Sequence, residues 1–425
     1  MSRSWWPQQL LLGWLNLMLT APMIYLFVGL PLVMRQHGWS GTEIGMIQMA
    51  GLPAMLKFVL ATPVDRWRLG QGTASYRNWA VRLGLAYAAA LLLLGLNDLP
   101  HTSYRALFAL AMLVSLCGTW ADVPVNALAI RILPESERMR AGAIRSAATS
   151  LGAIVGGGLM LMLQARAGWG WPFFVLAAGM LAALLLVPWL RPRAGEGVTA
   201  GPPPAPAGLR EWLSWFALPQ HRAWAVLLVL YYPLIGAVWV YLKPLMLDMG
   251  FAPEHIALTI GVAGGLVAAI ASMAGSWVSR RSGARQALVW FAAGNVLALG
   301  LLGGAVWFQA GPGMLVGAAM AVALMMGASA GLVFGLMMYH ARTGLAALDY
   351  GLQSSLFVIG RTTVPMLAGV LLDACGYPGM LLGLMAGLCL VTWLAVSLRR
   401  RIFVYGEDST GVVQRRSASA IKSLH

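Results

Sequence analysis

Long apolar runs, separated by short polar segments, occupy most of the chain between residues 10 and 398. An α-helix needs about 20 apolar residues to cross a bilayer. The pattern predicts an all-α membrane protein with twelve membrane-spanning helices. Their expected ranges are 10–34, 44–63, 79–97, 106–130, 143–165, 173–190, 224–248, 256–278, 287–309, 314–338, 351–374 and 380–398.

One long polar segment interrupts this series between the sixth and seventh runs. It contains "GEGVTAGPPPAPAG" (Gly195–Gly208), whose proline and glycine content cannot build a core. "LREWLSWFAL" (Leu209–Leu218) follows and predicts a short helix lying on the membrane surface. We therefore expect a six-helix bundle over residues 1–190, a cytoplasmic linker over 191–223, a second six-helix bundle over 224–398, and a basic cytoplasmic tail over 399–425.

The two halves carry related features at equivalent places. "HGWSGTEIG" (His37–Gly45) precedes the second run and "MGFAPEHIA" (Met249–Ala257) precedes the eighth. A basic loop follows both runs, as "ATPVDRWRLG" (Ala61–Gly70) and "GSWVSRRSG" (Gly275–Gly283). These matches predict two pseudo-symmetric bundles that arose as parallel repeats.

Composition agrees with a membrane protein, since 59% of the 425 residues are hydrophobic, only 10% are charged and the mean hydropathy is +0.74. The net charge of +15 comes mainly from arginines in alternate loops, which predicts that both termini are cytoplasmic. The opposite loops hold only Arg35, Arg105 and Arg166. We therefore expect the basic residues to meet anionic lipid headgroups and not nucleic acid.

Two opposite charges lie at similar depth in the second and fourth runs. Lys57 lies roughly 9 Å, and Asp122 roughly 12 Å, inside the cytoplasmic ends of their helices, at about 1.5 Å per residue. Buried membrane charges are usually paired, so we expect Lys57 to pair with Asp122, with Asn126 one turn away on the same face. The pair could be a static lock between helices, or it could open on protonation or on substrate binding.

Arg361 lies near the expected midplane of the eleventh run, in "VIGRTTVP" (Val358–Pro365). A guanidinium at that depth is expected to face a central cavity and to clamp a carboxylate or phenolate of a substrate. The alternative is that Arg361 binds a structural partner. Arg145 lies near the start of the fifth run, and we count it among the candidates for the ion-pair cluster. The alternative is that its side chain extends to the membrane interface.

Further polar and aromatic side chains are candidates for the lining of this cavity. They are Asn16 and Tyr25 in the first run and Tyr231, Tyr232 and Trp239 in the seventh. The aromatic residues could instead be packing or belt residues. Asp65 and Arg66 follow the second run in a tight loop, and we expect them to latch the two halves together on the cytoplasmic side.

Several kinds of chemistry are not supported. No Walker sequence is present, so ATP hydrolysis is not expected. "GASAG" (Gly327–Gly331) fits the GxSxG pattern but lies inside an apolar run. The six histidines have no metal-site spacing, so we expect no cofactor, and if iron is carried it is carried inside a ligand. With no nucleophile–base or metal constellation, we expect no enzyme activity.

Two segments resemble a known transporter family. "LPAMLKFVLATPVDR" (Leu52–Arg66) is similar to the LPW-x-x-KF-x-W-A-P-x-x-DR pattern of AmpG-type permeases, and "ADVPVNALA" (Ala121–Ala129) is similar to their QD-I-x-x-D-A motif. The chain thereby resembles the major facilitator superfamily over about residues 10–400. The resemblance implies Lys57, Asp65, Arg66 and Asp122 as motif residues.

This sequence differs from the AmpG pattern because Asn126 replaces a second aspartate and the tryptophan near the lysine is absent. Its compact length is closer to the RhtX/FptX-type siderophore importers, which include the pyochelin importer. The resemblance implies a monomeric secondary transporter in the bacterial inner membrane. It would import an anionic siderophore, or its ferric complex, by proton-driven alternating access. The alternatives are an AmpG-like permease for cell-wall sugar peptides and a non-transporting membrane sensor.

Overall fold

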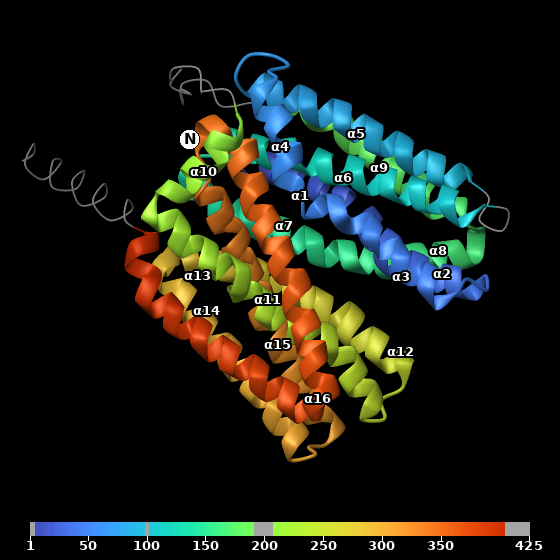
Figure 1. The fold of residues 1–425 in the computed structure, drawn as a ribbon, viewed down its shortest axis with the longest axis vertical. Coiled ribbons are helices and arrows are strands. Elements are labelled where there is room, and N and C mark those ends of the chain that lie inside the picture. Colours follow the sequence, from blue (N-terminus) through green and yellow to red (C-terminus); the bar gives the residue numbers. More distant parts are fainter. Residues whose placement is uncertain (1–4, 98–101, 191–206, 404–425) are drawn as a thin grey trace, which may run out of the picture.

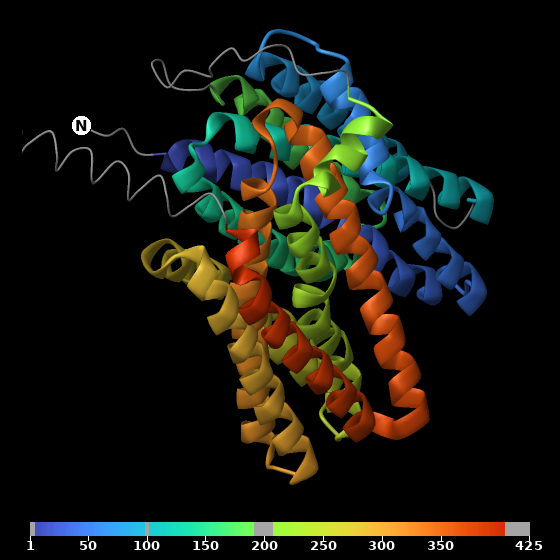
Figure 2. The same cartoon turned by 60° about the vertical axis from the view of Figure 1, so that its left-hand side comes forward.

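The computed structural model describes residues 5–97, 102–190 and 207–403, which are helical and contain no strand. Eleven helical segments are long and apolar enough to cross a membrane. The last of them, Thr343–Ile402, has 60 residues and would be about 90 Å long, three times the bilayer core. It divides at Gly376, whose φ of +65° suits glycine but few other residues. Figure 2 shows the chain reversing there, which confirms twelve predicted crossings.

In the first half, four crossings contain breaks or short extensions and two are single helices. The first crossing is α1 (Trp6–Ile24), η1 (Tyr25–Gly29) and α2 (Leu30–Gln36). The second is α3 (Gly41–Ile47), η2 (Gln48–Ala54) and α4 (Lys57–Arg66). Then come α5 (Thr73–Leu96), α6 (Tyr104–Ile132), α7 (Glu135–Ile154), η4 (Val155–Leu159), α8 (Met160–Ala167), α9 (Gly170–Leu186) and η5 (Val187–Trp189).

The second half begins with the short helix α10 (Leu209–Ala217). Its crossings are α11 (Pro219–Asp248), α12 (Pro253–Ile256) with η6 (Ala257–Ala263) and α13 (Gly264–Ser282), α14 (Ala284–Trp307), α15 (Pro312–Tyr339), and α16 (Ala346–Ile402), which is preceded by η7 (Thr343–Leu345). Residues 191–206 of the predicted linker and residues 404–425 of the predicted tail lie outside the described residues. The predicted domain boundaries therefore stay a prediction.

Local sequence explains where some of these helices begin. At the start of α3, Ser40 and Glu43 form a capping box: the Ser40 hydroxyl accepts from the Glu43 N–H at 3.2 Å, and Glu43 accepts from the Ser40 N–H at 2.9 Å. In the same crossing, the 3-10 segment η2 contains Pro53 and ends just before α4. As a result, α4 begins at Lys57, deep within the crossing.

The two halves meet at the end of the molecule where α10 lies, which we call the α10 end, and diverge toward the opposite end (Figure 1). Helix α7 packs against α13 and α15, and α4 packs against α16. Polar contacts cross between the halves at the α10 end. Arg131 donates to the Thr343 carbonyl at 3.0 Å, and the Leu348 N–H donates to Asp65 at 2.7 Å.

Helix α10 itself touches both halves. Its Trp212 Nε1 donates to the Thr62 hydroxyl at 3.1 Å, and its fully buried Trp215 donates to the His340 carbonyl at 3.2 Å. Burial lowers the pKa of His340 to about 3, so this histidine is neutral at physiological pH. Leu209 and Leu213 remain 65% exposed on the outer face. The predicted helix therefore exists, and its contact with the membrane surface stays a prediction.

Close approach at the α10 end requires glycine. A Cβ added to Gly142 on α7 would overlap the backbone of Gly335 on α15. We expect Gly142→Ala to push these helices apart and to increase the distance between the halves at the α10 end. Spin labels at the exposed positions Arg68 and Arg281, in a background without Cys117, Cys375 and Cys389, would measure that distance.

Gly158, on the same crossing, is the matched control, because a Cβ there would meet nothing within 4 Å. Gly158→Ala should leave the label distance at its wild-type value. If the label distance in Gly142→Ala also equals the wild-type value, the close contact between Gly142 and Gly335 does not determine how near the halves lie at the α10 end.

Candidate functional site

A buried ion triad lies in the first half, built from one carboxylate and two cations. The Lys57 ammonium on α4 donates to Asp122 Oδ2 on α6 at 2.7 Å. Arg145 on α7 grips the same carboxylate with two bonds, Nη1 to Oδ1 at 2.8 Å and Nη2 to Oδ2 at 3.1 Å. Lys57 and Asp122 are only 7% and 8% exposed. The structure therefore contains the predicted pair and adds a second cation, so the triad carries one surplus positive charge.

Two amides complete this cluster. Asn126 Nδ2 donates to Asp122 Oδ1 at 3.0 Å, one turn along α6 as expected. Asn16 Oδ1 on α1 accepts from Arg145 Nη1 at 2.8 Å. Asp122 thus accepts from three side chains, which is the kind of compensation that a buried carboxylate needs. Asn16, expected to line the substrate cavity, is here a partner of Arg145.

Aromatic rings from the second half cover the triad. The Arg145 guanidinium carbon lies 5.2 Å from the ring centroid of Phe334 on α15 and 5.4 Å from that of Tyr350 on α16. These are cation–π distances. The surplus charge of the first half therefore faces the contact surface with the second half.

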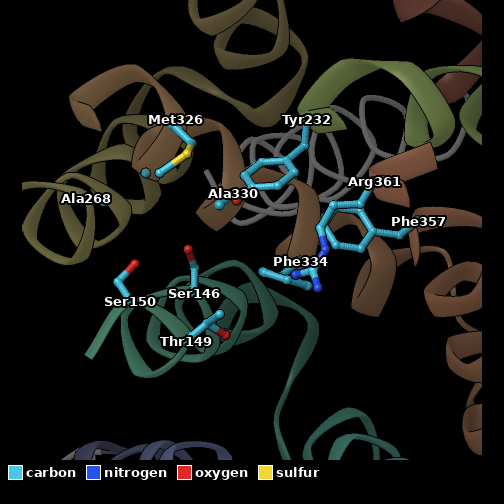
Figure 3. Close-up of a pocket in the computed structure, with 11 residues that line it drawn as sticks. Ser146, Thr149, Ser150, Tyr232, Ala268, Met326, Ala330, Phe334, Phe357 and Arg361 are labelled. Atoms are coloured by element: carbon cyan, nitrogen blue, oxygen red, sulfur yellow. The ribbon is translucent and has the colours of Figure 1, made fainter. Parts of the chain in front are cut away.

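A small pocket, which Phe334 also lines, lies between the halves (Figure 3). Helix α7 contributes the hydroxyl side chains, and α11, α13, α15 and α16 contribute the rest. The lining residues are Ser146, Thr149, Ser150, Tyr232, Ala268, Met326, Gly327, Ala330, Phe334, Phe357 and Arg361. The cavity volume is about 30 Å³, whereas sites for drug-sized ligands occupy about 300–1,000 Å³. The halves must separate around this pocket before a cargo can enter.

Arg361 is the one charged residue of this lining. Its side chain is exposed, and Figure 3 shows it beside Phe357 and Phe334. Among the described residues, no carboxylate forms an ion pair with it. The guanidinium is therefore available to an anion that enters between the halves.

Of the other predicted site residues, some lie at the contact between the halves and others lie inside one half. Tyr232 lines the pocket with Arg361. Tyr25 is buried against Phe173, with ring centroids 5.2 Å apart, and Tyr231 donates to the Leu288 carbonyl at 2.7 Å. The structure thus places both tyrosines inside their own halves, away from the pocket. Trp239 is not part of the pocket lining either and lies beside Gly264.

The predicted cytoplasmic gate residues lie at the α10 end. Asp65 accepts from the Tyr76 hydroxyl at 2.5 Å and from the Leu348 N–H at the start of α16 at 2.7 Å. It therefore joins the two halves directly. Arg66 is exposed. At the same end, Arg342 forms an ion pair with Asp349 at 2.8 Å and donates to Ser214 of α10 at 2.9 Å. The pKa of Arg342 is raised, since Asp349 stabilises its charge against the effect of burial.

Sequence reasoning missed the hydroxyl wall of the pocket and the aromatic cover of the triad. Ser146, Thr149 and Ser150 share one face of α7 at spacings of three and four residues, a signal visible in "RSAATS" (Arg145–Ser150). Phe334, Tyr350 and Phe357 carried no comparable signal, because single aromatic side chains occur in most of the apolar runs.

The comparisons with known proteins agree on one family. The sequence profile described as Major Facilitator Superfamily matches residues 11–348. The anhydromuropeptide permease of Escherichia coli strain K12 is 24% identical over 375 residues, which cover 82% of this chain and 73% of the permease. The permease of Escherichia coli O157:H7 matches equally.

Two solved structures share the fold. A bacterial homologue of the iron transporter ferroportin, in an outward-facing state, has a TM-score of 0.70 at 16% identity and covers 92% of this chain and 98% of its own. FucP, a transporter in its outward conformation, has a TM-score of 0.70 at 18% identity with the same coverage. At these identities the likeness concerns the fold alone.

The triad predicts an unequal response to the loss of its members. Asp122→Asn leaves two buried cations without an anion, and we expect a loss of about 3–5 kcal/mol in unfolding free energy. Lys57→Met leaves Asp122 matched by Arg145 and should cost less. The double variant should lie between them. Thermal unfolding of the purified protein, together with folded yield, would measure this order.

Lys243→Met is the control, because it removes an exposed lysine from α11 and should leave stability unchanged. Strictly additive effects of Lys57→Met and Asp122→Asn would contradict direct pairing. Equal losses for the two single variants would contradict the surplus-cation interpretation.

Proposed function

The chain belongs to the Major Facilitator Superfamily, and from that premise we propose that it is a secondary active transporter that imports an anionic small molecule with protons. It is a membrane-embedded transporter and not an enzyme. Alternating access means that a site between two helix bundles opens to one side of the membrane at a time. The pocket between the halves is the candidate for that site.

The observation that carries the proposal is the unpaired guanidinium of Arg361 in this pocket. A cation deep in a membrane protein needs an anion or water. In the part of the chain that the structure describes, the deep carboxylate of Asp122 is already shared by Lys57 and Arg145. The surroundings of the pocket therefore carry a net positive charge. An anionic cargo is the simplest partner, and the planar fork of Arg361 suits a carboxylate or phenolate.

The arginine bias of the loops makes the α10 end cytoplasmic in this proposal. Asp65, Arg131 and α10 close that end, while the opposite end diverges, so the described conformation would be outward-facing. The two solved structures described above, which share the fold, were also captured in outward states. The protein would lie in the bacterial inner membrane as a monomer with both termini in the cytoplasm.

For the cargo we favour a siderophore or its ferric complex, in which iron is bound by the cargo and not by the protein. This rests on the resemblance to the RhtX/FptX-type importers and on the positive charge of the pocket. The second candidate is a cell-wall sugar peptide. It is favoured by the 24% identity to an anhydromuropeptide permease, and by the shared pattern around Lys57 and Asp122.

Proton coupling has a candidate residue in Asp122. Two cations stabilise its ionised form, so a proton can occupy it only when at least one of them moves away. A cargo anion that attracts Arg145 would have that effect. Binding of cargo and binding of a proton would then support each other, as symport requires.

An imposed pH gradient, acidic outside, should drive accumulation of cargo in proteoliposomes. Radiolabelled ferric pyochelin is the first probe and an anhydromuropeptide the second. Uptake should stop when an uncoupler collapses the pH gradient. Accumulation that persists with only a sodium gradient would reject protons in favour of sodium, and saturable binding without any uptake would favour a sensor.

Arg361 should determine affinity for the anion. Arg361→Lys keeps the charge and loses the planar fork, so it should weaken binding. Arg361→Gln should weaken it further, by roughly 1.5–3 kcal/mol, or about 10- to 150-fold. Calorimetry on purified protein with the transported probe would measure both. Wild-type affinity in a folded Arg361→Gln variant would remove this residue from the site.

A further inference from the structure

The two walls of the pocket differ in chemistry. Helix α7 of the first half presents hydroxyl groups, whereas the second half presents aromatic rings and the guanidinium of Arg361 (Figure 3). The ring centroids of Tyr232 and Phe357 lie 5.2 Å apart, and those of Phe357 and Phe334 lie 5.4 Å apart. The second-half wall therefore contains three aromatic rings packed side by side, of which Phe334 and Phe357 are buried in this conformation, with a cation beside them.

The cation and the rings are held in fixed relation by the fold. Phe357 and Arg361 are four residues apart on α16, so they share one face of that helix. Tyr232 reaches the same place from α11, which packs closely on α16. Tyr232 is only half-buried, so part of its ring remains open to whatever enters the pocket.

The hydroxyl wall is largely engaged within the protein. The Ser146 hydroxyl bonds to that of Ser272 at 2.7 Å, and the Thr149 hydroxyl donates to the Arg145 carbonyl at 3.0 Å. The Ser150 hydroxyl makes no hydrogen bond among the described residues. The first half therefore has one hydroxyl to spare, and the aromatic wall supplies most of the available contact.

We infer that the site takes an aryl acid, in which a planar aromatic ring carries the anionic group. The anion would bind Arg361, and the ring would lie against Tyr232 and Phe357. This deepens the proposed function and rests on it. A saturated acid of the same charge could use Arg361 equally well, but it would lose the ring–ring attraction that aromatic pairs gain beyond simple burial.

The inference separates the two cargo candidates by chemistry. A sugar peptide offers carboxylates without an aromatic ring next to them. A phenolate or benzoate group offers both an anion and an aromatic ring, and Arg361 and Phe357 line the same pocket. The aromatic wall thus favours an aryl-containing chelator over a sugar acid.

Benzoate and cyclohexanecarboxylate are the matched probes, because both are carboxylates of similar size and are ionised at neutral pH. Binding to the purified full-length protein can be followed by ligand-observed NMR titration. We expect benzoate to bind about 2- to 10-fold more tightly, the range that one aromatic contact provides. The preference should disappear in Tyr232→Leu/Phe357→Leu, which keeps apolar side chains at both positions, and should persist in Tyr232→Phe.

Phe308→Leu is the matched control, since Phe308 is an aromatic residue that is 82% exposed and lies outside the pocket; it should retain the preference. Unfolding curves would verify that every variant is folded. Equal affinity for the two probes, or no saturable binding of benzoate, would overturn the inference. So would tighter binding of N-acetylmuramic acid than of benzoate, a result that favours the sugar-peptide cargo.

Failure of this inference can be distinguished from failure of the proposed function. Equal affinities that are both lost in Arg361→Gln would leave an anion transporter without aryl selectivity. Affinities unaffected by Arg361→Gln would remove the anion site itself.

Discussion

The carboxylate of Asp122 is the interaction on which the arrangement of the first half depends. Helix α4 brings Lys57 to it and α7 brings Arg145, while α1 reaches the same cluster through Asn16. None of these cations could remain deep in a bilayer without an anion. Three helices are thereby held to α6 by one charge. Because Phe334 and Tyr350 cover Arg145 from the other half, this cluster also borders the contact between the halves.

The contact between the halves is of a different kind. It uses close approach at Gly142 and Gly335, and single hydrogen bonds such as those of Asp65 and Arg131 to backbone groups. Such contacts can be released one by one without exposing the interior of either bundle. The strong ion-pair interactions of the triad lie within one half, whereas the contacts between the halves are weaker and can be released. That division would suit the alternating access proposed here, in which the halves rock against each other while each stays intact.

The triad and Arg361 are two positive sites that lie close together. They differ in whether an anion of the protein balances the charge. The triad is satisfied internally and leaves one surplus charge beneath aromatic rings. Arg361 has no ion-pair partner among the described residues and faces the pocket. Phe334 contacts Arg145 and also lines the pocket, so both sites share this ring. In the proposed mechanism, a cargo that displaces the ring would affect both sites, and this is how cargo binding would reach the charge state of Asp122.

The sequence by itself determined the membrane class, the twelve crossings and the pairing of Lys57 with Asp122, because apolar run length and the cost of buried charge are local properties. It also indicated Arg361, since no interface lies near enough for snorkelling. It did not determine that Arg145 shares Asp122, since its depth suited the membrane interface equally well. Nor did it separate Tyr232, which lines the pocket, from its neighbour Tyr231, which lies inside its own half. Adjacent residues on a helix point about 100° apart, and only the packing of α11 against α14 and α16 decides which of the two faces the pocket.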